Sequence, residues 1–72
     1  MLNKYEVNIL KGGPLDLQRF SVYADTIDAA AIRAGYELQQ QEPAEEIRVL
    51  SNYAYIAWES GGILCEIIQA NE

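Results

Sequence analysis

The sequence predicts an α+β fold, in which an antiparallel sheet of four to five strands carries a single helix packed on one face, in a ββαββ-type order. Two patterns lead to this prediction. Apolar and polar residues alternate in several short segments, as they do in half-buried strands, whereas one Ala-rich segment repeats its apolar residues with the helical period. The chain has 72 residues, which is the length of one domain, 1–72.

Alternation on either side of a Gly-Pro segment predicts the first two strands. In KYEVNIL, the side chains of Tyr5, Val7 and Ile9 point to one side of an extended chain. The segment KGGPLD then interrupts the strand. A second strand follows in QRFSVYA, with Phe20 and Val22 on one side. Because the connection is short, we expect the two strands to form an antiparallel hairpin.

The segment ADTIDAAAIRAGYELQQQEP predicts the helix. Asp25 or Thr26 can cap its start, and Pro43 cannot continue it. At about 100° per residue, one stripe of the helix is apolar. The stripe consists of Ile27, Ala31, Ala34 and Leu38, with Ala30 at its border. Small side chains let the helix approach the sheet closely, which would explain Gly35 beside the stripe although glycine costs a helix up to about 1 kcal/mol.

Three more strands follow the helix. AEEIRVLSN predicts a strand centred on residues 47–50, and YAYIAWES and GILCEIIQA predict a hairpin. Gly61 and Gly62 are expected as the two central turn residues, because glycine readily adopts positive φ angles. This register places Trp58 opposite Cys65. A slip of one residue would exchange the faces of one strand.

The predicted hairpin has one face that its own helix cannot cover. The face expected beneath the helix is uncharged and carries Ala54, Ile56, Trp58, Cys65 and Ile67. The other face carries Tyr53, Tyr55, Leu64 and Ile68, with Glu59 and Glu66 among them. Tyrosine is enriched at protein interfaces, so we interpret these six residues as partner-binding. A mixed surface tolerated on a monomer is the alternative, and it is the interpretation we favour for Ile32 and Tyr36 on the helix.

The composition favours a protein partner. The formal net charge is −6 and the five basic residues are scattered, so the surface repels phosphate backbones and direct nucleic-acid binding is not expected. No segment approaches the roughly 18 apolar residues of a membrane span, and the first residues do not resemble a signal peptide. A lone cysteine fits a reducing cytoplasm. We expect a cytoplasmic protein that binds another chain, either a target or a second copy.

Residues that commonly perform catalysis or hold metals are scarce. There is no histidine, and the single cysteine, Cys65, lies on the expected core face, so a tetrahedral zinc site is not expected. Asp25 and Asp28 fit the start of the helix. Glu45 and Glu46 fit a solvated run before a strand. We therefore predict no catalytic residue, no metal and no cofactor. A small enzyme that uses a carboxylate is the competing interpretation.

The run RFSVYADTIDAAAIRAGYELQ resembles a pattern found in small proteins of phages and their bacterial hosts. In this pattern a strand ends in V-x-A-D-T/S and an Ala-rich helix follows at once. The order of strands and helix along the whole chain is similar as well. Small acidic phage proteins of known action often bind and block a host protein, as anti-CRISPR proteins do. The motif itself contains no functional residue that could be carried over.

The resemblance and the uncovered face together predict a small acidic, non-enzymatic protein-binding module. We expect a phage-type inhibitor that occludes the surface of a host protein, acting in the host cytoplasm if it is phage-encoded. The alternative is a homodimeric structural protein that buries the outer face of its sheet.

Overall fold

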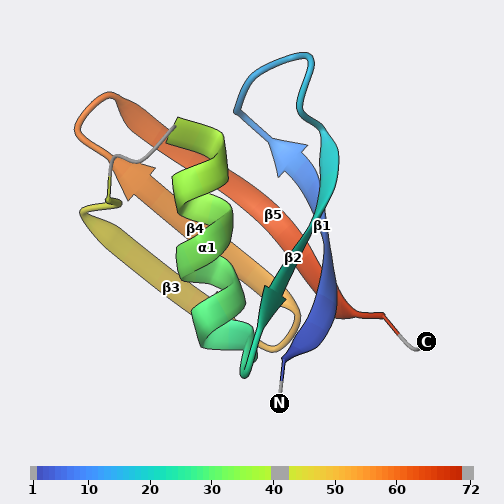
Figure 1. Ribbon diagram of the computed structural model, residues 1–72. Helices are drawn as coiled ribbons and strands as arrows, with labels where there is room; N and C mark the ends of the chain where they lie inside the picture. The colour runs from blue at the N-terminus through green and yellow to red at the C-terminus, as the bar shows by residue number, and fades with distance from the viewer. Residues whose placement is uncertain (1, 40–42, 71–72) are drawn as a thin grey trace.

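The computed structural model describes residues 2–39 and 43–70. Within these ranges there are five strands and one helix, namely β1 (Asn3–Lys11), β2 (Arg19–Ala24), α1 (Ile27–Gln39), β3 (Glu46–Leu50), β4 (Tyr53–Trp58) and β5 (Gly61–Gln69). The strands form one sheet in the order β2-β1-β5-β4-β3, and α1 lies across one face of it (Figure 1). The α+β prediction is confirmed. The three strands predicted after the helix are all present, so the observed order is ββαβββ, with one strand more than a ββαββ-type order.

All neighbouring strands of the sheet are antiparallel. β1 and β2 form the expected hairpin, in which Val7 faces Phe20 and Tyr5 faces Val22. On its other side β1 pairs with β5, the last strand of the chain, with Val7 opposite Ile67. The first and last strands therefore lie side by side in the middle of the sheet, and β2 and β3 form its two edges (Figure 1).

The helix α1 begins at the predicted cap. The Ala29 backbone N–H donates a hydrogen bond to Thr26 Oγ1 at 3.1 Å, and the Ala30 N–H donates to the Thr26 carbonyl at 2.9 Å. Thr26, rather than Asp25, is therefore the N-cap residue. α1 ends at Gln39, and the predicted continuation toward Pro43 falls partly on residues 40–42, outside the described residues.

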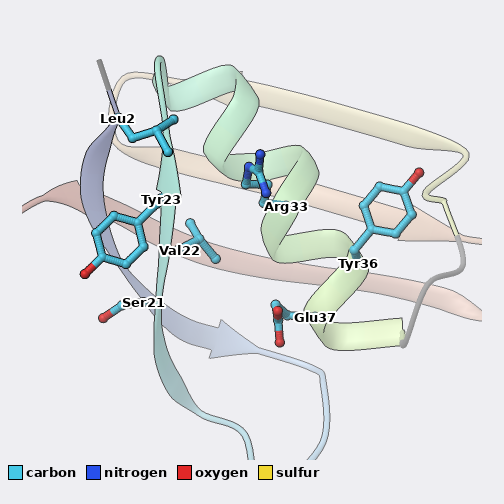
Figure 2. A pocket seen from close by; sticks show the side chains of 7 residues that line it. All are labelled: Leu2, Ser21, Val22, Tyr23, Arg33, Tyr36 and Glu37. Carbon is cyan, nitrogen blue, oxygen red and sulfur yellow. The ribbon is translucent and has the colours of Figure 1, made fainter.

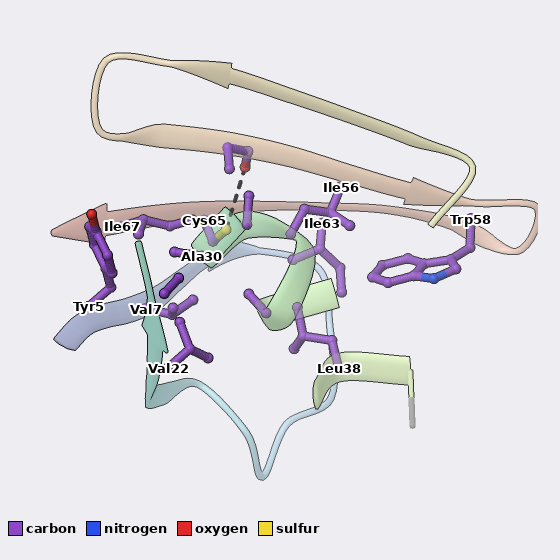
Figure 3. Close-up of a cluster of buried hydrophobic side chains, with 14 residues drawn as sticks. Tyr5, Val7, Val22, Ala30, Leu38, Ile56, Trp58, Ile63, Cys65 and Ile67 are labelled. Carbon is purple, nitrogen blue, oxygen red and sulfur yellow. Dashed lines mark hydrogen bonds between the residues drawn. The ribbon is translucent and has the colours of Figure 1, made fainter. Parts of the chain in front are cut away.

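The core lies between α1 and the sheet (Figure 3). The alanines of the predicted stripe, Ala30, Ala31 and Ala34, are fully buried. From the sheet, the largest fully buried side chains are Ile56, Ile67, Val7 and Cys65. Small residues on the helix and branched residues on the strands thus meet in one layer, as close packing requires.

The β4–β5 hairpin differs from its predicted register. Glu59 and Ser60 form the turn, and Trp58 pairs with Gly61 instead of Cys65. The glycines belong to β5, and the positive φ of 147° falls on Gly61, immediately after the turn. The error is four positions along β5. Because four is even, every side chain within β4 and β5 keeps its predicted face, and the predicted core face of this hairpin is confirmed by its burial.

Candidate protein-binding surface

The face of the sheet opposite α1 exposes the predicted tyrosine and aliphatic side chains. Tyr53 and Tyr55 are 48% and 42% exposed, and Leu64 and Ile68 are 37% and 41% exposed. The intervening residues of β4, including Ala54 and Ile56, are buried toward the helix. Alternation along the strands therefore separates a covered face from an uncovered one.

Cross-strand pairing makes these exposed side chains neighbours. Tyr55 lies opposite Leu64 on β5, and Tyr53 lies opposite Leu50 on β3. Leu50 is 80% exposed and is absent from the predicted site, although the alternation in EIRVL already indicates an outward side chain. We call the set of Leu50, Tyr53, Tyr55, Leu64 and Ile68 the outer patch.

The two predicted acidic members lie differently. Glu66 is on β5 opposite Tyr53, within the outer patch, and is partly buried. Glu59 is exposed in the β4–β5 turn, at the end of the hairpin rather than on its face. On β3, Arg48 lies opposite Tyr55 and forms an ion pair with Glu46. The outer patch therefore includes the carboxylate of Glu66 among its apolar side chains, and the Arg48–Glu46 ion pair borders it on β3.

The ring of Tyr55 covers the backbone of a glycine. A Cβ atom built on Gly62 would overlap the phenol ring and would lie 2.7 Å from Tyr55 Cε1. Gly62 is diagonal to Tyr55 across the β4–β5 pair, and its missing side chain leaves the space that the ring occupies. Packing against the strand thus restricts the orientation of one of the two tyrosine side chains in the outer patch, as in other glycine–aromatic pairs of sheets.

The other half of the same face is polar. On β2 and β1, the Ser21 hydroxyl donates a hydrogen bond to Glu6 Oε2 at 3.0 Å, and Arg19 Nε donates to Asn8 Oδ1 at 2.8 Å. These side chains satisfy one another across the strand pair. The outer patch therefore lies on β3, β4 and β5, whereas on β2 the same face also exposes Tyr23, which is 51% exposed.

A hollow lies beside the edge strand β2 and has a volume of about 400 Å³. It is lined by Leu2, Ser21, Val22, Tyr23, Arg33, Tyr36 and Glu37. Figure 2 shows that side chains of α1 form one wall and β2 forms the other. On the helix, Ile32 and Tyr36 are 49% and 44% exposed, and Ile32 does not line this hollow.

The residues with possible reactive chemistry are placed as follows. Cys65 is fully buried, donates a hydrogen bond from Sγ to the Ala54 carbonyl at 3.5 Å (Figure 3), and has a pKa that burial raises to about 11. A thiol with this pKa stays protonated near neutral pH.

Among residues 2–39 and 43–70, no cluster of His, Cys, Asp and Glu side chains has an arrangement suited to a metal ion. The helix in the same ranges is not long and apolar enough to cross a membrane.

Comparison of this chain with known protein families, with curated proteins and with solved structures finds no match.

Proposed function

We propose that this protein is a non-enzymatic binding module whose outer patch docks on another protein and blocks the surface that it covers. The proposal rests on one observation, the exposure of two tyrosines and three aliphatic side chains on neighbouring strands of a face without a helix. Contiguous exposed apolar side chains with a charged border are typical of interfaces. The resemblance to small phage proteins suggests that the target is a host protein.

The proposed partner surface has an apolar depression bordered by lysine or arginine. Tyr55 is the proposed anchor, because its ring is already oriented by Gly62 and therefore loses little freedom on binding. Glu66 within the patch and the net charge of −6 favour a basic border on the partner. Opposite charges speed the encounter, whereas the buried rings and aliphatic side chains supply most of the affinity.

Tyr55→Ala and Ile68→Ala should both weaken binding, because each removes an exposed apolar side chain from the outer patch. The immobilised protein would first capture its partner from bacterial lysate, and the purified partner would then be titrated against each variant. We expect the dissociation constant to rise at least about tenfold for Tyr55→Ala. Ile32→Ala is the matched control for Ile68→Ala, because Ile32 is similarly exposed but lies on the helix.

Gly62→Ala tests the orientation of the ring without removing it. Gly62 does not have a positive φ, so alanine fits the backbone, and its methyl group has to displace the phenol ring. We expect weaker binding with little change in the free energy of unfolding. Unchanged affinity in Tyr55→Ala, Ile68→Ala and Gly62→Ala, with circular dichroism like that of the wild type, would contradict the proposed function.

A homodimer that buries the outer patch is the competing assignment. Light scattering on the same variants distinguishes this homodimer from a module that binds a foreign protein. Such a dimer would dissociate in Tyr55→Ala and would bind no foreign chain through this face.

A further inference from the structure

We infer that the edge of β2 pairs with the edge of β2 from a second copy of this chain, so that two sheets join into one across a two-fold axis at Val22. This surface is separate from the outer patch, because β2 and β3 lie at opposite edges of the sheet. The inference is therefore independent of the proposed function. It rests on the backbone groups of β2, on the lack of edge protection there, and on the charges beside it.

Hydrogen bonding within the sheet shows which backbone groups of β2 face outward. The Ile9 N–H donates to the Gln18 carbonyl at 2.8 Å, in the same register that pairs the rest of β1 with β2. Hydrogen-bonded and non-hydrogen-bonded pairs alternate along antiparallel strands. The residues whose N–H and C=O point away from β1 are therefore Arg19, Ser21 and Tyr23. They form a row of donors and acceptors that an antiparallel strand can satisfy.

β2 has few of the features that keep edge strands apart. It pairs with β1 over six residues without a bulge, contains no proline, and carries no charge after Arg19. The opposite edge, β3, carries Glu46 and Arg48 within five residues. Edge strands without charges, bulges or proline are the ones prone to pair with another chain.

A two-fold axis at Val22 makes the pairing self-complementary. Ser21 of each copy then lies opposite Tyr23 of the other, and both have outward-pointing backbone groups. The same register places Arg19 opposite the second copy's Asp25, a pair of opposite charges. On the helix side, Val22 meets its own copy, which extends the apolar layer across the junction.

The hollow beside β2 adds a second charge match. Arg33 and Glu37 are one helical turn apart and both line it. In Figure 2, Arg33 lies on the side of Tyr23, and Glu37 lies on the side of Ser21. The two-fold axis reverses this order in the second copy, so that Arg33 of each copy comes level with Glu37 of the other. An interface between identical surfaces requires this kind of reciprocal match.

Light scattering and analytical ultracentrifugation of the full chain over a range of concentrations test the inference. We expect twice the 8.1 kDa chain mass. Ser21→Pro should give a folded monomer, because proline removes an N–H that points to the edge and is tolerated at such positions. Arg33→Glu should raise the dimer dissociation constant about tenfold by placing two glutamates together. The double variant Arg33→Glu/Glu37→Arg should return the dimer dissociation constant to the wild-type value.

Leu50→Lys is the control, because it places a charge at the other edge and should leave the β2 dimer intact. The inference is overturned by a wild-type protein that stays monomeric at every concentration, by a dimer that survives in folded Ser21→Pro, or by a dimer that Leu50→Lys dissociates and Ser21→Pro does not. The last result would place the contact on the outer patch.

Discussion

At the scale of single residues, the buried thiol of Cys65 makes the stability of the fold depend on pH. Burial raises its pKa from an ordinary value of 9.0 to about 11, because the charged thiolate is poorly solvated there. The unfolded chain therefore loses this proton at a lower pH than the folded chain does. Below pH 9 both states hold the proton and the thiol does not make stability depend on pH. Between pH 9 and 11 only the unfolded state becomes charged, so stability falls as pH rises.

We expect this decline to reach about 2 kcal/mol by pH 11. Urea unfolding at intervals from pH 8 to pH 11 would measure it. Cys65→Ala is the control, because it lowers stability at every pH through the cavity it leaves but lacks the thiol titration. The difference between the two unfolding free energies should shrink above pH 9. A constant difference across this range would contradict the role of Cys65.

The exposure of Tyr55 and Ile68 could be predicted from the sequence, whereas the way in which the Tyr55 ring is held could not. Alternation alone assigns a side chain to a face, and the faces of β4 and β5 follow from it. The contact between Tyr55 and Gly62 depends on the register between the strands, which the double glycine suggested incorrectly. Gly62 leaves space for the Tyr55 ring to pack on the backbone of β5, and it is not a central residue of the turn.

At the scale of elements, Gly35 shows how closely α1 approaches β4. A Cβ atom on Gly35 would lie 3.4 Å from Ile56 Cγ2 and 3.6 Å from Trp58 Cζ2. The predicted close approach is present, yet these distances still accept one methyl group in ordinary contact. Because alanine favours a helix by up to about 1 kcal/mol over glycine, we expect Gly35→Ala to raise the free energy of unfolding by about 0.5–1 kcal/mol. Urea unfolding would measure the gain.

Gly35→Leu is the companion variant. Its longer side chain has no space between α1 and β4, so it should destabilise the protein by about 1–3 kcal/mol. A loss of stability in Gly35→Ala as well would mean that the Ile56 side chain cannot move to make room for a methyl group, and that packing requires glycine at position 35.

At the scale of the whole molecule, local sequence patterns predict where the strands and the helix occur better than they predict which strands pair in the sheet. The strands, the helix and its Thr26 cap follow from short-range periodicity. The pairing of β1 with β5 joins the two ends of the chain and depends on contacts that no local pattern encodes. Leu50 is a different case, since the alternation in EIRVL indicates its outward side chain, and only its place beside Tyr53 depends on the β3–β4 register.

The net charge of −6 also acts on the whole molecule. The start of β3 and the β4–β5 turn lie at the same end of the protein (Figure 1). Glu45 and Glu46 lie beside Ala57 near the end of β4, and Glu59 is in the turn that follows β4. Of these three acids, Glu46 is paired with Arg48. Like charges held close together in the folded state oppose folding, and salt screens them.

Raising sodium chloride from 10 to 200 mM should therefore stabilise the protein by about 0.5–1 kcal/mol, because the Debye length falls below the separation of exposed charges. The measurement is the urea midpoint at pH 7, made on the Ser21→Pro variant so that association does not contribute. Replacing Glu45 and Glu59 by glutamine should raise the midpoint at low salt and reduce its dependence on salt. A midpoint that falls as salt is added would instead mean that attractive pairs, such as Glu46 with Arg48, outweigh the repulsion among the acids.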